Sequence, residues 1–321
     1  MSFIYSLSLF SPEDHECDVF GDGPVEEESR RAWEECFQNR NHENFIPARQ
    51  FEMTHLPGGF QTDLHLQYVR YITKRTVRIK VGYVSWERPN GYTFSGFRGR
   101  KKPHWGSGWI SDVSYFNGQC FCVECDGKPE PKTGCYQLKV HTARHVVFNT
   151  EEALHCEVHL YHEEKHPSEN EAPTVLTFRG KQASDLNLRR DISTVLCVTH
   201  EETLFTELST FREEKNQMWR TLREKAKPVE PSDLVACVII SHPHGQPKKI
   251  TVGGLVDTLD SAGVPNLFDF YDGKTCRGSS GGPVIVWRAS QPTPDPYMIP
   301  APHSSRKDVN CSKSGGRPFF F

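Results

Sequence analysis

The chain has 321 residues, of which 36% are hydrophobic, with 38 basic and 41 acidic side chains. The resulting net charge of −3 argues against a nucleic-acid-binding surface or another polyanionic partner. No apolar run reaches the roughly 18 residues that cross a membrane, and the N-terminus lacks the basic region and cleavage site of a signal peptide. The 11 cysteines are odd in number, and their spacing does not suggest a disulfide framework, so we expect reduced thiols and a cytoplasmic location.

Residues 1–75 are expected to form a helical extension. Residues 26–38 carry their apolar side chains on one side at helical spacing, and a second helical segment, 61–71, follows a Pro-Gly-Gly breaker. The sequence leaves open whether this extension packs on the rest of the protein or covers a cleft.

Strand-like alternation begins after the extension and predicts a first β-barrel over residues 76–200. Residues 77–84 alternate apolar and polar side chains with a period of two. A later strand, 136–140, leads into His145, and the apolar run that follows Asp191 closes this half of the chain.

Four cysteines, Cys120, Cys122, Cys125 and Cys135, gather in a loop between two predicted strands. The Cys-x-Cys-x-x-Cys cluster can place three thiolates at about 2.3 Å from one Zn²⁺, with Cys135 as the fourth ligand. A loop without its own core gains stability from such a metal. The alternative is that these thiols bind nothing. We expect any zinc here to be structural, because no His-Glu-x-x-His pattern is present to activate a water.

A helical linker and a second barrel are expected in the remaining chain. Residues 201–232 mix large apolar side chains with charges and end in two prolines, which predicts the linker. The second barrel, 233–321, opens with an apolar strand and the turn 241–245. His242 and His244 in this turn form a conceivable metal pair, although turn residues that support the barrel are the preferred interpretation.

The Gly-Ser-Ser-Gly-Gly-Pro run at residues 278–283 is the most informative motif. It places Ser280 on a turn so tight that two neighbouring backbone N–H groups can converge on one point, where the oxygen of a tetrahedral acyl intermediate would sit. A serine is a weak nucleophile without a base and an orienting carboxylate. His145, which follows a Thr-Ala-x step, and Asp191, which enters an apolar strand, supply those two groups upstream.

The chain order His145, Asp191, Ser280 resembles that of the trypsin/chymotrypsin-like serine peptidases, over roughly residues 76–320. The resemblance implies a mainly β fold of two six-stranded barrels, here joined by a helical linker and preceded by a helical extension. It further implies that the backbone N–H groups of Gly278 and Ser280 form the oxyanion hole. No organic cofactor is implied.

The function implied is that of an intracellular serine endopeptidase, which cleaves peptide or protein substrates through an acyl-enzyme. One departure concerns the residue before the nucleophile, which is Ser279, whereas trypsin-like zymogens carry Asp there to pair with a newly freed N-terminus. That activation route is therefore closed. The sequence indicates neither an oligomeric state nor a cleavage preference.

Neighbouring residues compete for each catalytic role. His141, Asp185 and Ser279 lie close to the chosen residues but fit the motif register less well. A protein-binding module with an inactive or latent peptidase fold is the main alternative function, because the chain continues for only a short, Pro- and Ser-rich stretch after the motif. An α/β-hydrolase esterase is a third reading, and it would need a histidine after the serine, such as His303.

Overall fold

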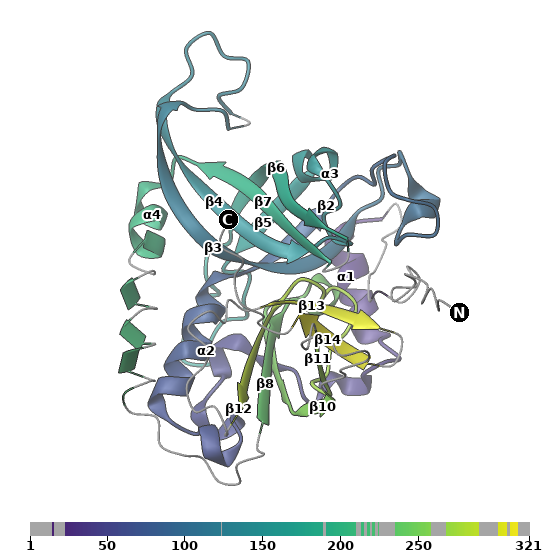
Figure 1. Ribbon diagram of the computed structural model, residues 1–321, viewed down its shortest axis with the longest axis vertical. Coiled ribbons are helices and arrows are strands. Elements are labelled where there is room, and N and C mark those ends of the chain that lie inside the picture. Colours follow the sequence, from purple (N-terminus) through teal and green to yellow (C-terminus); the bar gives the residue numbers. More distant parts are fainter. Residues whose placement is uncertain are drawn as a thin grey trace, which may run out of the picture.

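The computed structural model is mainly β and contains two sheets (Figure 1). Six strands close into a barrel in the order β2-β3-β4-β7-β6-β5. These strands are β2 (Thr76–Val81), β3 (His104–Gln119), β4 (Thr133–Ala143), β5 (Cys156–Leu160), β6 (Leu176–Asn187) and β7 (Ile192–Thr199). The structure describes His15 and residues 23–122, 124–188, 191–209, 213–214, 217–218, 220–221, 224, 235–257, 268–288, 301–306 and 309–313.

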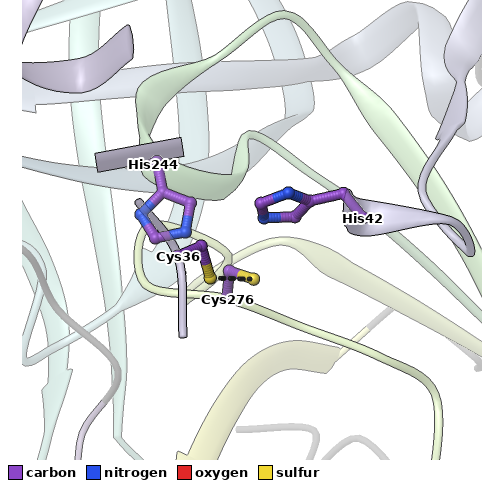
Figure 2. A group of neighbouring side chains, drawn as sticks. All are labelled: Cys36, His42, His244 and Cys276. Carbon is purple, nitrogen blue, oxygen red and sulfur yellow. Dashed lines mark hydrogen bonds between the residues drawn. The ribbon is translucent and has the colours of Figure 1, made fainter. Parts of the chain in front are cut away.

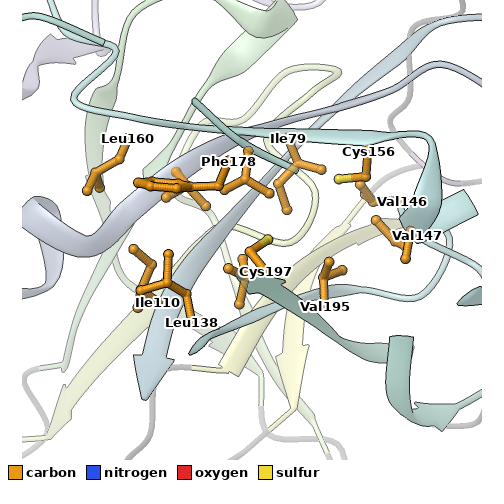
Figure 3. Packing of buried hydrophobic residues seen from close by; sticks show 14 of the residues in the cluster. Ile79, Ile110, Leu138, Val146, Val147, Cys156, Leu160, Phe178, Val195 and Cys197 are labelled. Carbon is orange, nitrogen blue, oxygen red and sulfur yellow. The ribbon is translucent and has the colours of Figure 1, made fainter. Parts of the chain in front are cut away.

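The interior of the barrel is filled by aliphatic side chains from every strand (Figure 3). On β2, Val77, Ile79 and Val81 point inward and are fully buried, as the period of two predicts. The intervening Arg78 is also buried, and its guanidinium donates to Glu26 of the N-terminal extension and to the carbonyl of Gly245. Other parts of the chain therefore cover the outer face of the strand at Arg78.

The second sheet differs from the expected closed barrel of six strands. It has eight strands in the order β1-β9-β8-β12-β13-β14-β11-β10, and over the described residues its two end strands do not pair with each other. One end is supplied by the N-terminal extension, whose Ile46 pairs with Ile250. The strands are β1 (Ile46–Pro47), β8 (Val235–Ser241), β9 (Lys249–Gly253), β10 (Leu255–Asp257), β11 (Phe268–Tyr271), β12 (Pro283–Arg288), β13 (Ala301–Arg306) and β14 (Val309–Lys313).

The N-terminal extension packs on the second sheet. It contains α1 (Val25–Glu34) and α2 (Asp63–Arg75), the latter capped by the Thr62 hydroxyl, which accepts a hydrogen bond from the backbone of His65. Phe60 and residues of α2 share one core with Trp287 and other apolar residues of the sheet. The extension also forms 3₁₀ turns at Arg40–His42, Ala48–Gln50, Met53–His55 and Gly58–Phe60.

Helix is sparse in the rest of the described chain. α3 (Thr150–Leu154) follows the segment that carries His145, and α4 (Glu202–Ser209) begins the predicted linker. Most of the linker beyond α4 lies outside the described residues. Within the part of the chain that the structure describes, no helix is both long and apolar enough to span a membrane.

Buried histidines lead to a prediction about acid stability. Burial lowers the pKa of His65, His104 and His159 to about 4, so the native protein keeps these rings neutral. An unfolded chain protonates histidine near pH 6.5, so stability should be complete above that value and decline as the pH falls toward 4. Each such histidine can add a slope of up to about 1.4 kcal/mol per pH unit.

Thermal unfolding between pH 7.5 and 5 measures this effect. We expect the melting temperature to stay constant from pH 7.5 to about 6.5 and to fall below that value, and the His65→Gln variant to show a shallower fall. Replacing the exposed His55 by Gln is the matched control, and it should leave the slope as in the wild type. A melting temperature that does not change between pH 7 and 5 would contradict the prediction.

Candidate active site

The turn that carries Ser280 has the conformation that its glycines permit. Gly278 and Gly281 adopt φ values of 89° and 85°, in the left-handed region that side chains disfavour. A Cβ at Gly278 would also lie 2.8 Å from the backbone nitrogen of His244, so no other residue fits there without a shift. The turn ends at β12, which fixes Ser280 at the entrance to a buried strand.

Ser107, on β3 of the barrel, holds this turn in place. Its backbone N–H donates to the carbonyl of Ser280 at 2.8 Å, and its hydroxyl donates to the carbonyl of Gly278 at 2.8 Å. A Cβ at Gly281 would lie 2.9 Å from the backbone nitrogen of Ala143, two residues before His145. These contacts bring the serine turn of the second sheet against the barrel segment that leads into the histidine.

The peptide group between Arg277 and Gly278 has a defined orientation. The carbonyl of Arg277 accepts a hydrogen bond from the backbone N–H of His244 at 2.5 Å. In a planar trans peptide the C=O and N–H bonds point in opposite directions, so the Gly278 N–H points away from the His244 turn. This is one of the two N–H groups for which the resemblance to trypsin-like peptidases implies a place in an oxyanion hole.

His145 and Asp191 are hydrogen-bonded to each other, as the sequence predicts for a base and its orienting carboxylate. The Nδ1 atom of His145 lies 2.5 Å from one carboxylate oxygen, and the backbone N–H of His145 donates to the other at 2.9 Å. Burial by itself raises the pKa of Asp191, but attraction to His145 and the hydrogen bonds from it outweigh burial and hold that pKa below its usual value. Asp191 therefore stays ionised and can fix the tautomer of the imidazole.

A buried ion pair supports the segment that carries His145. Arg88 donates two hydrogen bonds to Glu152, at 2.6 and 2.7 Å, and neither side chain is exposed. The same guanidinium donates to the backbone carbonyl of His145 at 3.1 Å, and Glu152 accepts from the backbone of Phe148 at 2.9 Å. Sequence reasoning missed this pair, since nothing local shows that Arg88 lies beneath the histidine.

Two of the competing residues, Ser279 and His141, make hydrogen-bonding contacts away from the candidate triad. The Ser279 hydroxyl accepts from Ser241 at 3.1 Å, on the side of the second sheet, and His141 lies 3.1 Å from the Thr194 hydroxyl. His303 is placed on β13, with its Nδ1 atom 2.5 Å from the Tyr271 hydroxyl. All strand pairs of the described residues are antiparallel, which excludes the parallel sheet of an α/β-hydrolase.

The described site is closed to solvent. Ser280 and His145 both have an exposed fraction of 0%. The imidazole of His15 stacks on that of His145, with ring centroids 4.0 Å apart and planes 8° from parallel, and its Nε2 lies 3.8 Å from Asp191. His15 also lies 2.6 Å from the Thr93 hydroxyl. One face of the candidate base is therefore covered by a residue of the N-terminal extension, which is one of the two roles that the sequence left open.

The cysteine loop between β3 and β4 forms a compact group of donor atoms. The sulfur atoms of Cys120, Cys122 and Cys125 lie 3.3, 3.5 and 3.4 Å from the Nε2 atom of His200. His200, which follows β7, takes the place that the sequence assigned to Cys135. Cys135 is buried in the same apolar cluster, but its sulfur is outside this group of four. His200 was missed because it is distant in sequence and meets the loop only through the β4–β7 pairing.

No family model and no curated protein matches this chain. Similar solved structures include that of Deg5, which is 14% identical, with 77% of this chain and 88% of that chain covered and a TM-score of 0.38. A serine endoprotease from Yersinia pestis is 12% identical, with coverages of 78% and 62% and a TM-score of 0.36. A variant of the HtrA-type protease AlgW with a tripeptide is 11% identical, with coverages of 76% and 57% and a TM-score of 0.36. The chain spans less than two thirds of the last two proteins.

Proposed function

We propose that the protein is a serine endopeptidase that cleaves peptide or protein substrates through His145, Asp191 and Ser280. The observation that carries this proposal is the buried His145–Asp191 hydrogen bond of 2.5 Å, in a segment that contacts the turn of Ser280. A carboxylate on one imidazole nitrogen leaves the other nitrogen as the basic one. The Ser280 turn, framed by left-handed glycines, supplies the nucleophile and the N–H groups of Gly278 and Ser280.

The reaction would proceed in two stages. The Ser280 oxygen adds to the scissile carbonyl carbon while His145 takes its proton, and the carbonyl electron pair moves to the oxygen that Gly278 and Ser280 N–H groups stabilise. His145 then gives the proton to the leaving amine as the C–N bond breaks, which leaves an ester on Ser280. In the second stage, water adds to the ester carbonyl while His145 takes its proton. The bond to the Ser280 oxygen then breaks, and His145 returns the proton to the serine.

A latent or non-catalytic protein-binding form is the second candidate. It is favoured by one specific observation, namely that the described Ser280 and His145 are both fully buried and that His15 stacks on the histidine. In such a form the fold would bind partners while its catalytic groups stay covered.

Labelling with a fluorophosphonate probe, read by intact mass, distinguishes the two functions. We expect one adduct on the purified wild type and none on Ser280→Ala. Ser279→Ala is the matched control, because its hydroxyl contacts the second sheet, and it should still be labelled. A folded wild type without any adduct would contradict the endopeptidase and favour the binding form.

Uncovering His145 should accelerate the same labelling reaction. A stacked ring pair contributes about 0.5–1.5 kcal/mol, so His15→Ala should raise the labelling rate by about 2- to 13-fold. His15→Phe keeps a stacking ring and should label at close to the wild-type rate. Equal rates for the wild type and His15→Ala would show that His15 does not control access to the site.

We further propose that Cys120, Cys122, Cys125 and His200 bind a structural Zn²⁺. Tetrahedral zinc with bonds of about 2.3 Å to sulfur and 2.0–2.1 Å to nitrogen requires S···N separations of about 3.5 Å. The three separations of 3.3 to 3.5 Å match this requirement. Such an ion would anchor the β3–β4 loop to the end of β7 and would take no part in the reaction.

A further inference from the structure

Figure 2 shows a second group of side chains of the kinds that bind metals. It contains Cys36, just after α1, and His42, in the 3₁₀ turn Arg40–His42. The other two members are His244, in the 3₁₀ turn η7 (Pro243–Gly245), and Cys276, in the loop that precedes Ser280. One donor atom from each of the four lies within 4.8 Å of the others. The group joins the N-terminal extension to the second sheet.

The distance between the two sulfur atoms fits metal coordination. Cys36 Sγ and Cys276 Sγ are 3.6 Å apart, whereas a disulfide bond is about 2.05 Å long. Two sulfurs bound to a tetrahedral zinc at about 2.3 Å would be about 3.8 Å apart. The His42 and His244 rings meet edge to face, at 86° and with centroids 5.8 Å apart, which suits two corners of a tetrahedron better than a stacked pair.

The surroundings hold the ligands in place. Trp33 stacks on His42, with ring centroids 3.5 Å apart and planes 10° from parallel. The side-chain amide of Asn39 donates to the sulfur of Cys276 at 3.1 Å. Hydrogen bonds of this kind orient the ligands in metal sites. His42 is 7% exposed, and its Nε2 atom is buried without a hydrogen bond to any part of the chain that the structure describes.

Backbone conformation adds independent support. His42 and His244 have φ values of 50° and 53°, and Asn41 has 62°, all in the left-handed region that residues other than glycine rarely adopt. Such conformations persist where the surrounding structure enforces them, often at ligand sites. Two of the four donors are thus held in strained backbone, which bonds to a metal would offset.

We propose that Cys36, His42, His244 and Cys276 bind one Zn²⁺ as a closed tetrahedral site that joins the N-terminal extension to the turn of Ser280. Two thiolates and two imidazoles favour zinc over Mg²⁺ or Ca²⁺, which prefer oxygen ligands. All four positions are filled by the protein, so the ion is structural.

The site would hold the peptide group between Arg277 and Gly278 in place from two sides. His244 donates its backbone N–H to the carbonyl of Arg277, and Cys276 directly precedes Arg277. A zinc ion that holds both ligands therefore fixes the orientation of the Gly278 N–H. The Ser29 hydroxyl of α1 donates to the backbone carbonyl of His244 in η7 at 2.5 Å. Loss of the ion should loosen the orientation of the Gly278 N–H and separate α1 from η7.

Metal content of the purified full-length chain, measured by elemental analysis and native mass spectrometry, tests the proposal. His42→Ala and Cys36→Ser should each lose about one equivalent of zinc relative to the wild type. His55→Ala, which changes an exposed histidine of the same extension, should lose none, and Cys122→Ser should lose only the ion of the β3–β4 loop. Wild-type zinc content in folded His42→Ala, or a Cys36–Cys276 disulfide in the wild type, would overturn the proposal.

Cobalt gives a test that leaves all four proposed ligands unchanged. Wild type treated with a chelator should melt at a lower temperature and regain its stability when Co²⁺ is added, with the visible bands of tetrahedral thiolate coordination. In the Cys122→Ser background these bands report on the proposed site alone, and their absence would overturn it. This readout is separate from the endopeptidase proposal. Fluorophosphonate labelling can fail in a protein that binds zinc, and labelling can succeed in a protein that binds none.

Discussion

Replacing Asp191 by Asn should slow acylation of Ser280 by about 10⁴-fold while the fold stays intact. In the wild type both carboxylate oxygens accept hydrogen bonds from His145, one from the backbone and one from the ring. If the Asn oxygen keeps the backbone bond, its NH₂ group faces the ring nitrogen, which must then accept. The proton moves to the other nitrogen, and His145 can no longer act as a base toward the serine.

The backbone at this position makes the substitution informative. Asp191 has φ of 51°, and Asn tolerates the left-handed region as well as Asp does. The second-order rate constant of fluorophosphonate labelling measures the effect, with the melting temperature as a check on folding. Asp185→Asn is the matched control, because Asp185 also has a left-handed φ, of 52°, and should label like the wild type. A labelling rate of Asp191→Asn within tenfold of the wild type would contradict the assigned role.

Replacing Glu152 by Ala should destabilise the protein by about 3–5 kcal/mol. The change would leave the guanidinium of Arg88 buried without its counter-charge, and would remove the acceptor of the backbone N–H groups of Ser85 and Phe148. Since Arg88 also donates to the carbonyl of His145, we expect slower labelling of Ser280 in the same variant. Urea denaturation, with the free energy extrapolated to water, measures the loss.

Two further variants distinguish the contribution of the Arg88–Glu152 ion pair from the general effect of shortening a glutamate side chain. Glu157→Ala removes a half-exposed partner of Lys80 and should cost no more than about 1 kcal/mol. The double change Arg88→Met with Glu152→Leu removes both charges together, and it should be less harmful than Glu152→Ala alone. A loss for Glu152→Ala no larger than that for Glu157→Ala would contradict the proposed contribution of the buried pair.

Local sequence signals predicted the parts of the site that depend on local backbone. The left-handed glycines at 278 and 281 lie in one short motif, and β2 begins at Thr76, where the alternation of period two begins. The residues that brace the site could not be predicted in this way. Ser107 and His200 contact residues that are distant along the chain, and a single sequence carries no signal for such contacts.

The group of Cys36, His42, His244 and Cys276 also joins residues that are close in space but distant along the chain. His244 lies in a turn, as the sequence predicts, but the sequence does not show which residues surround it there. Its partners Cys36 and Cys276 are separated by 240 positions, and no spacing rule for metal ligands covers that distance. For the β3–β4 loop, closeness along the chain favours Cys135 as the fourth donor, whereas His200 is the donor that lies close to the three cysteines in space.

The N-terminal strand in the second sheet has a consequence for how the chain folds. Ile46 pairs with Ile250, about 200 residues later, and contacts with so large a sequence separation form slowly because a long loop must close first. During synthesis the extension cannot pack until β8 and β9 have left the ribosome, so its apolar side chains stay exposed until then. The barrel between them has mostly neighbouring strand pairs and can form earlier. Assembly of the second sheet should therefore be the late, aggregation-prone step, and a fragment that begins at Thr76 should not complete it.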